Sequence, residues 1–176
     1  MISSRWRSAL LAMMAALLLT GCDGGSTPKQ DNGGETLEVK TQADVEKVVT
    51  ALAESVAAEV GSPLQKMNFH PVLCDNAIGA PNTDGVWSLS GIASVAVKPT
   101  DQVPMITRLR DKWTELGYEI TEFRMFPPDN QRGTVSARIP SNDLSISLQS
   151  TAPGTGFAIT IGTPCYKPAP GENPGN

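Results

Sequence analysis

The sequence has few of the residues that enzymes use most often. It contains one histidine, His70, in 176 residues. A Ser-His-Asp triad would have to use that histidine, and no serine lies in a G-x-S-x-G motif. His70 precedes a proline in a segment that we expect to be a loop, which is more typical of a surface residue. We therefore predict no catalytic residue.

Metal and nucleotide sites are not indicated either. His70 and Cys74 are four residues apart, but a proline lies between them and zinc prefers three or four ligands. Asp129-Asn130 and Asn142-Asp143 are typical of turns, not of a calcium loop. Gly154-Thr155-Gly156 lacks the Lys-Ser/Thr of a phosphate-binding loop. We predict no metal and no cofactor.

No apolar run is long enough to span a bilayer. The longest, from Ala9 to Leu19, has eleven residues, whereas a transmembrane helix needs roughly 20. Arg5 and Arg7 precede this run and Thr20-Gly21 follow it. This is the pattern of a cleaved secretion signal, which we place at residues 1–21.

The end of the signal has a cysteine at the cleavage position. Leu19-Thr20-Gly21-Cys22 resembles the lipobox of bacterial lipoproteins. The resemblance implies that diacylglycerol is attached to the sulfur of Cys22 and that cleavage occurs before it; the alternative is an ordinary signal peptide containing a cysteine. Two buried acyl chains give stable membrane attachment. We expect a lipid-anchored protein on the extracytoplasmic face of the cell membrane.

The charge of the mature chain argues against some partners. Removing residues 1–21 leaves 12 basic and 18 acidic side chains, a formal net charge of −6. Nucleic acids and anionic lipid surfaces favour basic proteins. We therefore expect no nucleic acid partner, and membrane contact through the lipid on Cys22 alone.

Two cysteines remain in the folded part of the chain. In an oxidising compartment Cys74 and Cys165 are expected to form a disulfide. The alternative, a redox or metal-binding thiol, is less favoured because neither cysteine lies in a C-x-x-C motif.

Composition divides the mature chain into three parts. Residues 22–39 hold the lipidated cysteine and a Gly-rich segment that predicts a flexible tether. Residues 40–166 form one globular domain, and residues 167–176 are predicted to be a disordered tail.

Helical periodicity appears twice in the domain. Thr41 and Asp44 form a plausible capping pair before the first helix, and Gly61 ends it. Asp101 or the threonine before it caps the second helix, which ends at Gly117. The predicted buried faces contain Val45, Val48, Val49, Leu52, Val56 and Val60 in the first helix, and Ile106, Leu109, Trp113 and Leu116 in the second.

Alternating patterns predict strands in the rest of the domain. Residues 86–97 alternate apolar residues with serines, and Gly91 within them suggests a bulge or a close neighbour. Four further strand-like runs follow the second helix, separated by short loops that favour antiparallel hairpins. Residues 64–85 have the composition of a loop. The fold class is therefore α+β, an antiparallel sheet of about five strands with two helices on one face and one disulfide.

The arrangement resembles a group of known proteins. The lipobox, the Gly-rich tether, a cysteine in a loop, the helix with LRDKWTELGYEI and the terminal Thr163-Pro164-Cys165 are similar to small lipoproteins of actinobacterial cell envelopes. Most of those proteins have no assigned activity, so the resemblance implies location and fold more than function.

Three functions are compatible with these patterns. The first is a non-catalytic binding module that contacts another envelope protein. The second is a carrier or sensor of an apolar, lipid-like ligand held between the helices and the sheet, which requires an apolar cavity. The third is an envelope hydrolase, which requires a carboxylate pair. Glu119 and Glu122 lie on a polar strand, so a solvated face explains them better. The chain is therefore predicted not to be an enzyme.

Overall fold

The computed structural model describes residues 37–75, 84–152 and 154–174. The chain divides into the units Met1–Glu35 and Thr36–Asn176, and all described residues belong to the second unit. The predicted signal peptide, the predicted lipidation site at Cys22 and the predicted tether up to residue 36 lie outside the described residues.

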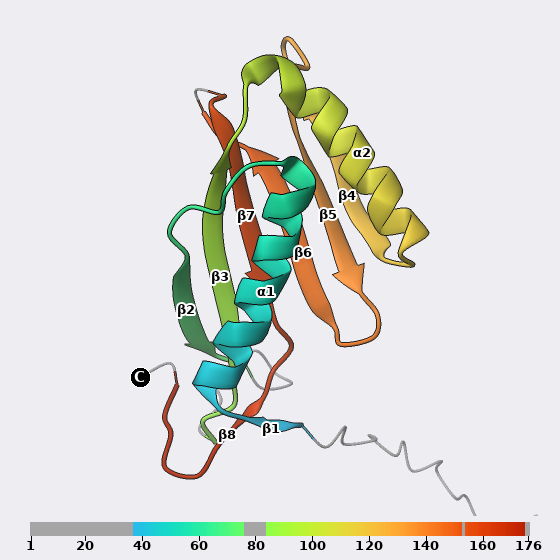
Figure 1. Cartoon of the computed structure of the whole chain (residues 1–176). Coiled ribbons are helices and arrows are strands. Elements are labelled where there is room, and N and C mark those ends of the chain that lie inside the picture. Colours follow the sequence, from blue (N-terminus) through green and yellow to red (C-terminus); the bar gives the residue numbers. More distant parts are fainter. Residues whose placement is uncertain (1–36, 76–83, 153, 175–176) are drawn as a thin grey trace, which may run out of the picture. The chain divides into compact units, whose positions relative to one another are not determined.

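Two α-helices and eight strands are formed by the described residues, in the order shown in Figure 1. The elements are β1 (Val39–Lys40), α1 (Gln42–Val60), β2 (Asn68–Leu73), β3 (Trp87–Ala96), a 3-10 turn (Pro99–Asp101), α2 (Gln102–Glu115), β4 (Glu119–Phe126), β5 (Arg132–Ile139), β6 (Leu144–Ser150), β7 (Gly156–Gly162) and β8 (Lys167–Pro168).

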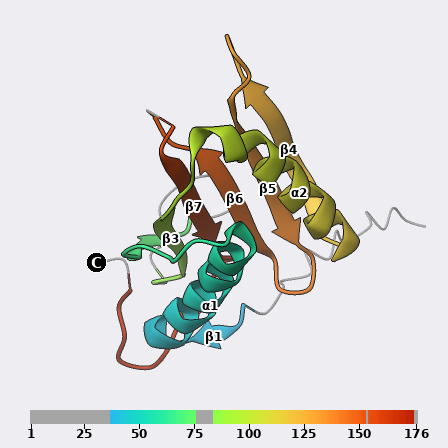
Figure 2. The same ribbon diagram turned by 45° about the horizontal axis from the view of Figure 1, so that its top comes forward.

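The main sheet has six antiparallel strands in the order β2-β3-β7-β6-β5-β4. Both helices lie on one face of it, α1 over β3 and β7, and α2 over β5 and β4 (Figures 1 and 2). This confirms the predicted α+β class, with two helices on one face of an antiparallel sheet. The sheet has one strand more than the five or so that were predicted.

The additional strand is β2, which the sequence analysis placed in a loop. Its six residues pair with β3 from Asn68 opposite Ile92 to Leu73 opposite Trp87. Pro71 lies in its middle and cannot donate a ladder hydrogen bond. An edge strand tolerates this loss because one side of its backbone has no strand partner. His70 therefore lies on an exposed edge strand and not in a loop.

The domain also extends beyond the predicted limits of 40 and 166. β1 and β8 form a small parallel sheet, so Lys167 and Pro168 are not part of a disordered tail. The backbone N–H of Lys167 donates to the carbonyl oxygen of Glu38 at 2.9 Å. A carboxylate oxygen of Glu172 accepts the N–H of Gln42, at the start of α1, at 3.0 Å. Segments before and after the predicted domain therefore stabilise the same end of the fold.

Local sequence signals explain the limits of α1. The Thr41 hydroxyl accepts the N–H of Asp44 at 3.1 Å and donates to its carboxylate at 2.8 Å. Gly61 adopts φ 74° and ends the helix in the left-handed conformation that glycine adopts without strain. Gly91 permits the helix to lie close to β3, since a Cβ atom there would be 2.4 Å from Cγ1 of Val49. The predicted close neighbour of Gly91 is therefore α1.

The predicted disulfide is confirmed. Cys74, just after β2, is bonded to Cys165, just after β7, with an S–S distance of 2.03 Å. Both tryptophans in the domain are buried in one apolar core. The ring of Trp87 packs on Tyr166 with a centroid distance of 5.9 Å, whereas Trp113 lies on α2.

The two faces of the sheet differ in chemistry. On the helix face the side chains are apolar and buried, with Leu89, Leu148 and Ile161 no more than 1% exposed. The opposite face, which neither helix covers (Figure 2), has short polar side chains such as Ser88 and Ser147. The predicted serine-lined wet face of β3 is therefore part of a polar surface that extends over several strands. No helix of the described part of the chain has the length and hydropathy needed to cross a membrane.

Candidate binding groove

Two apolar residues that were predicted to be buried are exposed. Val48 on α1 has 51% of its surface accessible, and Leu116, the C-cap of α2, has 56%. The prediction assumed that every position of a helical apolar face packs on the sheet. Here the two helices lie over different pairs of strands, so the flanks that face each other are not fully covered.

Polar contacts between the two helices gather at Glu59 in the described part of the chain. The Lys112 ammonium forms an ion pair with the Glu59 carboxylate, and Arg108 donates to the carbonyl oxygen of Glu59. Glu59 lies in the last turn of α1, and the helices diverge from this contact in both views (Figures 1 and 2).

An apolar hollow of about 310 Å³ lies between the two helices, and we call it the interhelical groove. Its lining consists of Leu52, Ser55, Val56 and Glu59 from α1 and Lys112, Trp113, Leu116 and Tyr118 from the end of α2 and the turn after it. Val56 and Trp113 are buried and form its base, whereas Leu116 is exposed at its rim. The groove is open to solvent and is not a sealed cavity.

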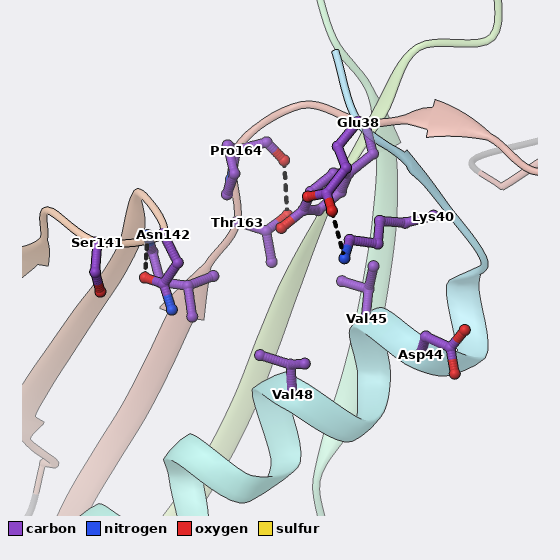
Figure 3. Close-up of a pocket in the computed structure, with 11 residues that line it drawn as sticks. Glu38, Lys40, Asp44, Val45, Val48, Ser141, Asn142, Thr163 and Pro164 are labelled. Atoms are coloured by element: carbon purple, nitrogen blue, oxygen red, sulfur yellow. Dashed lines mark hydrogen bonds and ion pairs between the residues drawn. The ribbon is translucent and has the colours of Figure 1, made fainter.

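A second hollow, of about 320 Å³, lies beside the first turns of α1, and we call it the amino-terminal hollow (Figure 3). It is lined by Glu38 and Lys40 around β1, by Asp44, Val45 and Val48 of α1, by Ser141, Asn142 and Leu144 near the β5–β6 turn, and by Thr163, Pro164 and Tyr166 after β7. In Figure 3 Val45 and Val48 point toward the segment that contains Thr163. This hollow has more polar groups than the interhelical groove.

The two hollows adjoin along α1. Val48 lines the amino-terminal hollow and Leu52 lines the interhelical groove. Residues four apart on a helix are neighbours on the same face, with Cβ atoms about 5–6 Å apart. The two hollows are therefore neighbours along α1, and the one at the start of the helix is the more polar.

Charges at the polar end are largely paired within the chain. The Lys40 ammonium lies 2.8 Å from the Glu38 carboxylate, and this hydrogen bond raises the pKa of Lys40. The hydroxyl of Thr41, followed by the ammonium of Lys47, lowers the pKa of Asp44. Burial raises the pKa of the Tyr166 phenol. Partners within the chain therefore stabilise the charged forms of Lys40 and Asp44, and burial favours the neutral form of the Tyr166 phenol.

Several residues singled out in the sequence are far from this surface or have structural roles. Cys22 lies outside the described residues. Cys165 is in the disulfide, and its neighbours Pro164 and Tyr166 line the amino-terminal hollow. Glu119 and Glu122 form ion pairs with Arg138 and Arg124 respectively. Within residues 37–75, 84–152 and 154–174, no group of three or more His, Cys, Asp or Glu residues could hold a metal ion.

The groove itself was not predicted from the sequence. The available signal was that the apolar stripes of both helices include flanking residues, Val48 and Leu116, outside the row that packs most directly on the sheet. Comparison with known proteins does not assign the site: no protein-family model matches the chain, and no significant match occurs among curated proteins or solved structures.

Proposed function

We propose that the protein is a lipid-anchored, extracytoplasmic lipoprotein of a bacterial cell envelope, and that its domain is a non-catalytic binding module. The interhelical groove is its binding surface, and the partner is an apolar segment of another envelope protein. The observation that supports this proposal best is the exposure of Leu116 at the rim of the groove, with Val48 exposed beside the neighbouring amino-terminal hollow.

The chemistry of the groove favours binding over catalysis. Its ionisable groups are Glu59, Lys112 and Tyr118, and the first two form an ion pair. A general acid or base must be able to reach a proton of the substrate, whereas these two side chains are engaged with each other. Apolar side chains around a shallow groove instead favour association with an apolar surface.

An apolar small ligand is the second candidate. A volume of about 310 Å³ is at the lower end of the 300–1,000 Å³ found for small-molecule sites. The adjoining amino-terminal hollow would lengthen such a site and give an amphiphile a polar end. We favour a protein partner because neither hollow is closed, whereas ligand sites enclose most of the ligand surface.

Photocrosslinking in cells can test the binding surface. A photoreactive amino acid is placed at position 116 or 48, and a matched control has it at position 72. Val72 has 50% of its surface accessible, close to the 56% of Leu116, but lies on the edge strand β2. We expect a protein adduct from positions 116 and 48 and none from position 72. An adduct of lipid mass would support the carrier, and the same products from all three positions would contradict a specific groove.

A separate experiment addresses the membrane anchor. In the Cys22→Ala variant the proposed site of lipid attachment is absent, so the protein should leave the membrane fraction. Retention of this variant in the membrane fraction after a high-salt wash would exclude the anchor. Because the crosslinking compares groove and control positions, failure of the anchor and failure of the groove can be distinguished.

A further inference from the structure

The outer edge of β4 has no strand beside it among the described residues. β4 is the last strand of the six-stranded sheet and pairs with β5 on one side. An edge strand of eight residues presents a row of backbone donors and acceptors that can pair with another strand. Proteins commonly protect such edges with charged side chains, and the arrangement of the charges on β4 indicates which strand could still pair with it.

β4 has two opposite charges, Glu122 and Arg124, two residues apart on the same face of the sheet. Glu122 lies opposite Ser136 and Arg124 lies opposite Thr134 of β5, so both side chains project from the face that the helices do not cover. Within one chain Nε of Arg124 lies 2.7 Å from the carboxylate of Glu122. A second strand with the same two charges, running antiparallel to β4, could place an opposite charge beside each of them.

An antiparallel pair of β4 strands from two copies has few possible registers. With the two-fold axis at Phe123, Glu122 lies opposite Arg124 of the other copy, and Arg124 lies opposite its Glu122. With the axis at Glu122 or at Arg124, like charges lie directly opposite each other, which is destabilising. Of these three registers, the charge pattern favours the one centred on Phe123.

The opposite face of the strand is compatible with this register. Phe123 is 37% exposed and projects to the helix face, where the guanidinium of Arg110 on α2 lies 4.4 Å from its ring centroid. The axis would bring the two Phe123 rings together. A bulge between Ile120 and Glu122 interrupts the regular strand, which limits the regular pairing to about residues 121–125.

We propose that the protein forms a homodimer by antiparallel pairing of β4 with β4 of a second copy, in the register centred on Phe123. The pairing would join two six-stranded sheets edge to edge. It leaves the interhelical groove of each copy accessible, because the groove lies between the helices and not at the sheet edge. The proposal is independent of the function proposed for the groove.

Charge reversal tests the proposal directly. Sedimentation equilibrium of the full-length protein in density-matched detergent should show a monomer–dimer equilibrium. Glu122→Arg and Arg124→Glu each replace both opposite-charge pairs by like-charge pairs, so each should raise the dissociation constant about tenfold or more. The double variant Glu122→Arg/Arg124→Glu restores opposite charges in the same register and should restore the parent value. The proposal would be overturned if the parent protein is monomeric up to about 100 μM. It would also be overturned if the double variant dimerises no more tightly than the single variants.

A crosslinking measurement tests the register without changing a charge. Directly opposite residues of an antiparallel pair have Cα atoms about 4.5–5.5 Å apart, within the range of a disulfide. Phe123→Cys should therefore give a disulfide-linked dimer under mild oxidation. Val72→Cys on the other edge strand is the control. The unsubstituted protein shows how much disulfide-linked dimer forms through Cys22. Equal dimer yields from the Phe123→Cys and Val72→Cys variants would contradict the proposed interface.

Discussion

The contact between α1 and β3 at Gly91 determines how closely the first helix lies on the sheet. A Cβ atom at this position would be 2.4 Å from Cγ1 of Val49 and 2.6 Å from Cε of Met67. Ordinary contacts are 3.4 Å or longer. Met67 can move its terminal methyl group, but Val49 is completely buried and stiff about χ1. The substitution Gly91→Ala should therefore displace α1 from the sheet.

The expected destabilisation follows from these contacts. Overpacking in a core costs about 1–3 kcal/mol. The lower entropy of the unfolded Ala variant offsets at most about 1 kcal/mol. We therefore expect Gly91→Ala to reduce the free energy of unfolding by about 1–2 kcal/mol. Ser90→Ala, the neighbouring residue on the opposite face, should change it by less than about 0.5 kcal/mol.

A double-mutant cycle measured by urea unfolding tests the explanation. Val49→Ala alone should cost about 2 kcal/mol, because it leaves a cavity in the core. The new methyl group at position 91 would occupy part of that cavity. The double variant should therefore be more stable than the sum of the single effects predicts, by about 1 kcal/mol. Additive effects, or a Gly91→Ala variant as stable as the parent, would refute the reasoning.

Three further predictions concern the disulfide, the helix cap and the contact between the helices. Cys74 and Cys165 are 91 residues apart, so replacing both with alanine should lower the free energy of unfolding by about 4.6 kcal/mol in the chain-entropy model; a loss below about 2 kcal/mol would contradict it. The pKa of Asp44 is lowered in the folded state by Thr41 and Lys47, so its contribution to stability is present above the ordinary pKa of about 3.9 and is lost as the pH falls through the lowered value. The stability difference between the parent and Asp44→Asn, followed by urea unfolding, should therefore be constant near neutrality and shrink in acid, and a difference independent of pH would be inconsistent with this cause. The Glu59 and Lys112 side chains are 37% and 41% exposed, so Lys112→Met should change the free energy of unfolding by no more than about 1 kcal/mol, and a larger loss would mean that the ion pair is not solvent-screened.

Local patterns predicted most of the elements because their signals are strong. The stripe of α1 begins at a Thr41 cap and ends at Gly61, and both have the expected geometry. The disulfide was predicted only from the expected oxidising compartment and from the presence of two cysteines in the folded part of the chain. β2 was missed because Pro71 lies in its middle, and a proline is compatible with a strand mainly at a sheet edge, which one sequence does not reveal.

The groove depends on information that the local patterns do not contain. Periodicity placed Val48 and Leu116 on apolar faces, but their exposure depends on the distance between two helices that are far apart in the chain. That distance follows from which strands each helix covers, α1 over β3 and β7, and α2 over β5 and β4. Strand order is a tertiary property, so the exposed flanks could only be found in the folded structure.

Native mass spectrometry of the full-length protein, extracted gently from its own envelope, tests the central claim most directly. Leu116→Asp is the matched variant, because Leu116 is exposed and its replacement should have little effect on stability. We predict a complex with another protein for the unsubstituted protein, and loss of that complex in Leu116→Asp but not in Val72→Asp. A homodimer would be recognised by twice the monomer mass. Persistence of the complex in Leu116→Asp, or a parent that binds no other protein, would contradict the claim that the interhelical groove is a protein-binding surface.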